Sequence, residues 1–180
     1  NIVGGIMYNF HVMQRNRTDN GNNNSQEYLK NKYFRKAVEM FNDQKTLRAL
    51  TYFKKVYELD KYHKPTNKYI KHINQSYALF LTAKIHESKK QYVKAIKFYK
   101  QSIPLFPDSK NKIKKIRIKL QYIIRDLEIK GIRAYNKAKY AECIQIFEKL
   151  KVIDPKNNKV QLYLPRAKKR YNALKKLGNI

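Results

Sequence analysis

Three segments of the chain, at residues 47–60, 92–107 and 140–155, repeat one helical pattern. Each contains a small residue, directly followed by an aliphatic residue and then, three positions further on, by an aromatic one. The small residues are Ala49, Ala95 and Cys143, so the repeats are 46 and 48 positions apart. Apolar residues three and four positions apart lie on one face of an α-helix. A helical pattern that returns at a near-constant interval is typical of stacked helical hairpins, so the sequence predicts an all-α fold.

Further helices are expected between and after these segments. A stripe of apolar residues runs from Ile113 to Ala134 with helical spacing, and Pro65, Pro107 and Pro155 each follow a helical segment, where proline ends a helix. Candidate N-caps are Thr66, Asp108 and Ser109. An array of three hairpins needs a closing helix with a polar outer side, and residues 160–177 supply one. Its Pro165 predicts either a kink or the true first turn.

The pattern resembles the tetratricopeptide repeat family. The third copy carries the motif most clearly, and the first two copies follow it in register from residue 28 onward. Its residues in the third copy are Leu127, Gly131, Ala134, Tyr140, Cys143, Phe147, Leu150, Asp154 and Pro155. The resemblance implies an α-solenoid of three helical hairpins plus a C-terminal capping helix, in which small residues let two helices approach closely.

The spacing of the copies departs from this family, whose repeat is about 34 residues long. We attribute the excess to a lengthened first helix in the second and third hairpins, because residues 66–90 and 109–139 keep helical spacing throughout. A long loop is the alternative, but structureless loops beyond about 12 residues are uncommon in compact domains. The expected repeat domain covers residues 27–180, with repeats at about 28–63, 66–108 and 109–157 and the capping helix at 160–177.

Residues 1–26 are expected to lie outside this domain. Residues 2–13 are apolar but too short to span a bilayer, which takes roughly 20 residues. They are read either as the end of a membrane anchor or as a strand, a tail or vector-adjacent sequence. Residues 16–26 are polar and of low complexity, so they are read as a flexible linker.

The sequence offers little support for catalysis. No glycine-rich phosphate loop is present, and the four histidines lack metal-ligand spacing. Cys143 occupies a small core position, which predicts a buried, unreactive thiol. Asp126 and Glu128 are two positions apart on a helix and do not face each other. We therefore expect no enzyme, no cofactor, no metal and no small-molecule substrate.

By position, the resemblance implies a concave groove that holds a partner helix or peptide. Its expected lining residues are Phe34, Val38, Phe41, Tyr77, Phe80, Lys84, Glu87, Arg125, Glu128, Ile132 and Tyr135. Phe34 and Val38 replace polar members of the carboxylate clamp that some family members use, so that clamp is not predicted. An aromatic groove suits an amphipathic helix or an extended apolar segment. The alternative is that Phe34, Phe41 and Phe80 are ordinary core residues or are covered by the N-terminal tail.

The charge is a second feature with functional meaning. The chain has 41 basic and 13 acidic residues, a net charge of +28, and eleven of the basic residues lie between positions 109 and 139. Such a surface binds polyanions with strong salt dependence. The alternative is a solvated face in a lysine-biased sequence. The expected polyanion-binding residues are Lys110, Lys112, Lys114, Lys115, Arg117 and Lys119.

The sequence therefore leads to two functional hypotheses. The first is a non-catalytic scaffold or adaptor that binds a partner protein in a larger assembly. The second is a basic module that binds nucleic acid or an anionic membrane surface. Composition and fold together resemble envelope proteins of AT-rich bacteria such as spirochaetes, where repeat proteins act as scaffolds, including around the flagellar motor. That resemblance implies a membrane-associated, periplasmic location, with the cytoplasm as the alternative.

Overall fold

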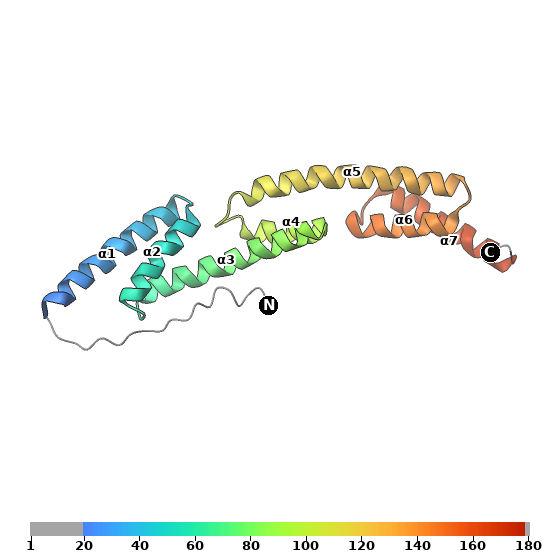
Figure 1. Cartoon of the computed structure of the whole chain (residues 1–180). Coiled ribbons are helices and arrows are strands. Elements are labelled where there is room, and N and C mark those ends of the chain that lie inside the picture. Colours follow the sequence, from blue (N-terminus) through green and yellow to red (C-terminus); the bar gives the residue numbers. More distant parts are fainter. Residues whose placement is uncertain (1–19, 179–180) are drawn as a thin grey trace. The chain divides into compact units, whose positions relative to one another are not determined.

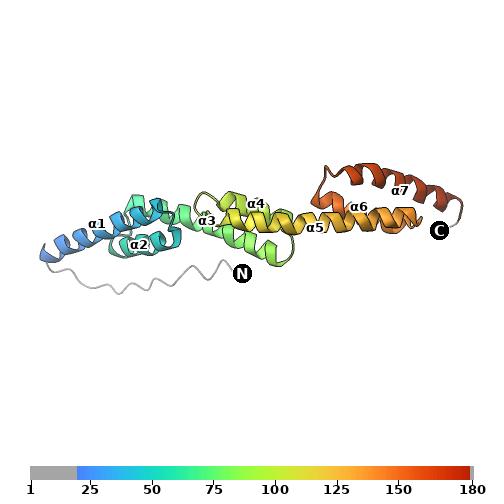
Figure 2. The same cartoon turned by 90° about the horizontal axis from the view of Figure 1, so that it is seen from above.

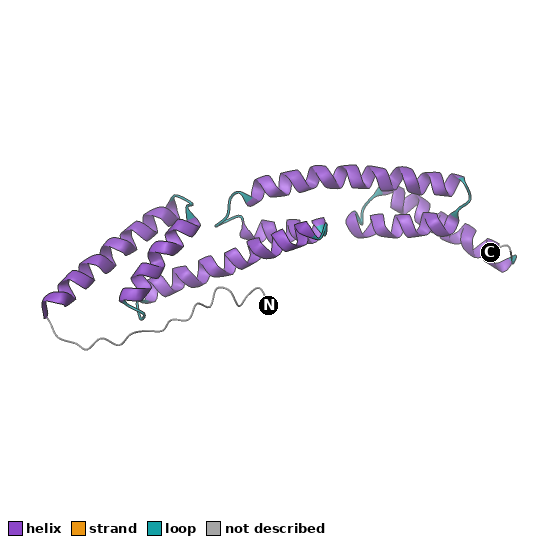
Figure 3. Ribbon diagram, in the orientation of Figure 1, coloured by secondary structure: helices purple, strands orange, loops and turns teal. Residues whose placement is uncertain are grey.

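The computed structural model describes residues 20–178, and every regular element in that range is a helix (Figures 1 and 3). The all-α prediction is confirmed. The helices are α1 (Asn20–Asn42), α2 (Thr46–Leu59), α3 (Lys64–Ser88), α4 (Tyr92–Ser102), α5 (Ser109–Asn136), α6 (Tyr140–Ile153) and α7 (Asn158–Lys176). The first six pair as three hairpins, and α7 is the expected closing helix. Residues 1–19, on which the membrane-anchor prediction falls, lie outside the described range.

The chain divides inside α3, after Ile70, into two compact units rather than the single expected domain. In the first unit α1 packs along α2. Its centre is aromatic: the ring of Tyr69, from the start of α3, stacks on the buried ring of Phe53 at 4.5 Å and meets Phe41 edge-on at 5.0 Å. Because α3 continues without a break past Ile70, one long helix takes part in both units.

The second unit contains two hydrophobic cores that share α5. The first half of α5 contributes Ile113 and Ile116 to a core with α3 and α4. Its second half contributes Ala134 to a core with α6 and α7. α5 has 28 residues and α3 has 25, so the first helices of the second and third hairpins are indeed long helices and not helices with long loops.

The repeated small and aromatic residues are the centres of these cores. Ala49, Ala95 and Cys143 are fully buried, and so are the aromatic residues four positions later, Phe53, Tyr99 and Phe147. In each hairpin the small residue leaves room for the neighbouring helix and the aromatic ring fills the space beside it.

The turn inside each hairpin also repeats. Gln44, Lys90 and Ala138 have φ of 60°, 58° and 58°, a left-handed conformation that is uncommon for residues other than glycine. In all three turns the next residue donates its N–H to the carbonyl oxygen five positions earlier, at 2.9 Å. The turns are 46 and 48 positions apart, as are the small core residues. The repeat is therefore present in the backbone as well as in the side chains.

Three local expectations differ from the structure. α1 begins at Asn20 rather than near Glu27, because extending an existing helix adds one hydrogen bond per residue at little further cost. Thr66 lies inside α3 and hydrogen-bonds the His63 ring at 2.7 Å instead of capping the helix. Pro165 lies within α7 and is not its first residue.

Candidate docking notch on helix α5

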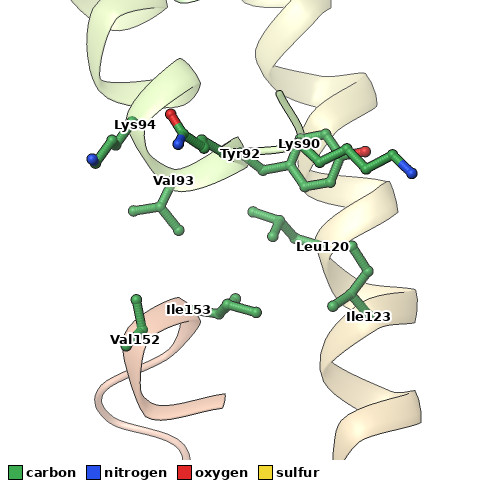
Figure 4. A pocket seen from close by; sticks show the side chains of 9 residues that line it. Lys90, Tyr92, Val93, Lys94, Leu120, Ile123, Val152 and Ile153 are labelled. Atoms are coloured by element: carbon green, nitrogen blue, oxygen red, sulfur yellow. The ribbon is translucent and has the colours of Figure 1, made fainter. Parts of the chain in front are cut away.

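The helix lengths in the second unit leave part of α5 uncovered. α4 packs along the first half of α5 and α6 along the second half. α4 has 11 residues and α6 has 14, so together they are shorter than the 28-residue α5. The start of α4 and the end of α6 therefore face each other across a gap, over the middle of α5 (Figure 4).

This gap is an open notch of about 500 Å³ with an apolar lining. Figure 4 shows Val93 above, Val152 and Ile153 below, and Leu120 and Ile123 projecting from α5 at the side. Val93 is 46% exposed and Val152 is 77% exposed. The full set of lining residues is Lys90, Gln91, Tyr92, Val93, Lys94, Leu120, Ile123, Val152 and Ile153.

The edge of the notch is positively charged. Lys90 and Lys94 belong to its lining, and Nζ of Lys119 lies 6.0 Å from the centre of the Tyr92 ring. No carboxylate belongs to the lining. An apolar floor beside cationic side chains can hold a bulky apolar group whose neighbours are acidic.

In the first unit, the residues predicted to line the groove pack against their own unit. Phe34 meets Phe53 edge-on at 6.0 Å and the His63 ring at 4.9 Å. Phe41 meets Tyr69 at 5.0 Å, and Val38 is half-buried on the same helix. Phe34 and Phe41 are half-buried, and both contact the aromatic centre of this unit.

In the second unit, most of the predicted groove residues also contact their own unit. On α3, Tyr77 and Phe80 stack on Phe106 at 5.5 and 5.3 Å. Oε2 of Glu87 accepts a 2.7 Å hydrogen bond from the Tyr99 hydroxyl. Lys84 is exposed.

On α5, Ile132 and Tyr135 pack against the core shared with α6 and α7. Oε1 of Glu128 accepts a 2.8 Å hydrogen bond from Asn157, and Arg125 is exposed. Residues of α3 and α5 that face the cores are therefore occupied in folding. A partner groove along these positions stays a prediction. The notch was not predicted from the sequence.

The six predicted polyanion-binding residues lie together on the first half of α5. Five are exposed and Lys112 is half-buried. Among the ion pairs of residues 20–178, none includes any of these six cations. Their positive charge is therefore not neutralised within the described part of the chain.

Two ionisable side chains, Cys143 and Tyr99, are buried in the two cores of the second unit. Cys143 is buried in the core of α5, α6 and α7, and burial raises the pKa of its thiol, which lowers its reactivity at neutral pH. Burial and the hydrogen bond to Glu87 raise the pKa of the Tyr99 phenol. Within the described range, no cluster of three or more histidine, cysteine, aspartate or glutamate side chains has the geometry of a metal site.

The sequence was compared with protein-family models and with curated proteins. No family model matches the chain, and no curated protein is similar enough to match it. None of the helices described here combines the length and apolar character needed to cross a bilayer.

Proposed function

We propose that this chain is a non-catalytic scaffold of the tetratricopeptide repeat kind, which binds a helix or peptide of a partner protein at the α5 notch. The observation that carries the proposal is the exposure of Val93 and Val152 on either side of a concave apolar lining. Because both side chains are exposed, they are available to a second molecule. The size of the notch falls within the range of roughly 300–1,000 Å³ typical of ligand-binding sites.

The repeat supports the proposal in a second way. Small core residues, aromatic residues and turns recur at the same intervals of 46 and 48 positions. Repeats of helical hairpins commonly serve as extended binding surfaces. The composition-based location at the periplasmic face of a cell envelope is part of the same proposal.

The notch can be tested with a pair of matched variants. Val152→Glu places a carboxylate in the notch, and Ile129→Glu makes a similar change at an exposed aliphatic residue of α5 outside the lining. The full chain and both variants are used as bait in native lysate at high salt with nuclease present. We expect at least one protein to be retained by the wild-type chain and by Ile129→Glu but not by Val152→Glu. Equal retention by all three baits would exclude the notch as the docking site.

Folding of each variant is checked by circular dichroism and thermal unfolding before the binding result is read. Both substituted positions are exposed, so both variants should unfold within a few degrees of the wild-type chain. A second variant, Val93→Glu, places a carboxylate in the notch from α4. It should also lose retention of the partner protein. Agreement between Val152→Glu and Val93→Glu would distinguish a notch effect from a local distortion of α6.

A second candidate function is binding of nucleic acid or an anionic membrane through Lys110, Lys112, Lys114, Lys115, Arg117 and Lys119. Its supporting observation is that none of these cations has an ion-pair partner in the described part of the chain. Each can contribute on the order of 1 kcal/mol near an anionic surface. Binding should weaken steeply as salt is raised, and it should be lost when several of the six are changed to glutamate. Affinity that is equal at low and high salt would exclude it.

A further inference from the structure

The side of α5 that faces away from both cores carries large exposed apolar residues. Ile118, Tyr122 and Ile129 are 47%, 73% and 50% exposed. They are separated by four and seven positions, which brings them to one side of the helix within about 40° of each other. We call these three residues the outer stripe.

Cations lie on both flanks of the outer stripe. At 100° per residue, Lys114 and Lys115 lie roughly 40–60° to either side of Ile118 on the helix circumference. Arg125 lies between Tyr122 and Ile129 on the same side. All three cations are exposed. The outer face of α5 therefore has an apolar middle with positively charged edges.

The two acids of α5 do not neutralise this face. Asp126 forms an ion pair with Lys130 at 2.7 Å, and Glu128 accepts the hydrogen bond from Asn157. The net charge near the outer stripe is consequently positive.

The outer stripe is separate from the notch and from the cores. The buried residues of α5, such as Ile116 and Ala134, point to the opposite side of the helix. Leu120 and Ile123, which line the notch, are roughly 120–180° from the middle of the outer stripe around the helix axis. Figures 1 and 2 show the ribbon of α5 with α4 and α6 beside it along one side only. Nothing in the described part of the second unit covers the outer stripe.

We propose that this outer face of α5 lies on an anionic lipid bilayer, with the outer stripe inserted at the level of the headgroups. Exposed apolar side chains bordered by lysine and arginine fit a bilayer interface, where the apolar groups enter the acyl boundary and the long cationic side chains reach the headgroups. Phosphates of a nucleic acid would engage the cations but would give two isoleucines no role. A second copy of the chain is disfavoured, because two such faces would bring like charges together.

The absence of tryptophan provides a direct test of insertion, since the sequence contains none. Tyr122→Trp in the full chain places a single indole on the outer stripe, and Leu177→Trp places one at an exposed apolar residue just after α7. Vesicles of phosphatidylcholine with about one third phosphatidylserine are added, alongside vesicles of phosphatidylcholine alone. We expect the indole emission of the Tyr122→Trp chain to shift to the blue with the anionic vesicles only. The emission of the Leu177→Trp chain should not shift with either.

A co-sedimentation experiment separates lipid from nucleic acid. The triple variant Ile118→Ser, Tyr122→Ser, Ile129→Ser keeps every charge, whereas Lys114→Gln, Lys115→Gln keeps the outer stripe. With the anionic vesicles, the triple variant should lose about tenfold or more in partitioning, because insertion depends on buried apolar area. With single-stranded polyuridylate it should bind as the wild-type chain does. The lysine variant should be weakened toward both probes.

Two results would overturn the proposal. One is unchanged vesicle binding by the triple variant, which would show that binding to the anionic vesicles depends on charge alone. The other is tight binding of polyuridylate with no partitioning into either vesicle, which would assign the outer face to nucleic acid. The proposal does not depend on the notch, since Val152→Glu leaves the outer stripe untouched and should partition like the wild-type chain.

Discussion

A methyl group added to Gly131 would lie 2.7 Å from Cε2 and Cζ of Phe147. Gly131 is on α5 and Phe147 is on α6, so the hydrogen atom of the glycine sets how closely these two helices approach. Phe147 is fully buried, and its ring stacks on that of Tyr163 at 5.7 Å. The ring is therefore held from the other side as well.

Gly131→Ala should destabilise the protein. Alanine favours the helix by about 1 kcal/mol over glycine, but overpacking a closed core typically costs about 1–3 kcal/mol. We expect a net loss of about 1 kcal/mol in the free energy of unfolding by denaturant. In the background of Phe147→Leu, the same substitution should become neutral or stabilising. A stabilising Gly131→Ala in the wild-type background would show that α5 and α6 can separate at no cost.

Glycine at the hairpin turns should have the opposite effect. Gln44, Lys90 and Ala138 all have positive φ, which costs a non-glycine residue roughly 1–2 kcal/mol. Ala138→Gly, and the equivalent changes at the other two turns, should each raise the free energy of unfolding by about 0.5–1 kcal/mol. Ala78→Gly, at an exposed position inside α3, is the control and should lower it by about 1 kcal/mol. Destabilisation at all three turns would contradict the shared turn geometry.

Asn157 joins three helices. Its side-chain oxygen accepts hydrogen bonds from the backbone N–H groups of Lys159 and Val160 at the start of α7. Its amide nitrogen donates to Glu128 on α5 at 2.8 Å and to Asp154, after α6, at 3.2 Å.

Asn157→Ala should lower the free energy of unfolding by about 1–2 kcal/mol through loss of the cap. Asn157→Asp keeps the cap acceptor but places a third carboxylate beside Glu128 and Asp154. It should be less stable than the wild-type chain at pH 7, because the two donor hydrogen bonds are lost and like charges close together repel. Urea unfolding at pH 7 measures the loss in both variants. An Asp variant as stable as the wild-type chain at pH 7 would show that the donor bonds contribute nothing.

The Tyr99 phenol makes the free energy of unfolding decrease at alkaline pH. Because burial and Glu87 raise its pKa in the folded protein, the unfolded chain releases this proton first as pH rises. The stability contributed by the neutral phenol is therefore fully present below about pH 10 and decreases above it. Tyr99→Phe should be less stable at pH 7 by about 1 kcal/mol, from the lost hydrogen bond, but should lose less stability between about pH 10 and 11. Tyr122→Phe, which removes an exposed hydroxyl, is the control for the same measurement.

The helical repeat could be predicted because its cause is local. A small residue and an aromatic residue four positions apart must lie on the same face of a helix, and the same pair returned three times. The long first helices followed from uninterrupted helical spacing between residues 109 and 139. These predictions needed only the rule that apolar residues on one face of a helix are buried. Ala95 and Tyr99, which lie on such a face, are fully buried.

The notch that we propose as a docking site could not be predicted in the same way. The predicted groove was carried over by position from the family resemblance, so residues such as Phe80 and Glu87 were expected to face a partner. In the second unit the two halves of α5 join different cores, and these side chains contact Phe106 and Tyr99 instead. The signal for the notch was present in the helix lengths, because two short second helices cannot cover one long first helix.

The continuity of α5 also makes the notch sensitive to insertions and deletions. Each residue added to the middle of α5 would rotate one core against the other by about 100° and move it by about 1.5 Å. Both cores could survive such a change, because each is built from its own half of the helix. The facing positions of Val93 and Val152 would not survive it. Seven added residues, close to two full turns, would nearly restore the rotation but would widen the notch by about 10 Å. The number of residues in α5 is therefore more restricted than their identity. It sets the rotation about the helix axis between the two cores, and this rotation places Val93 opposite Val152.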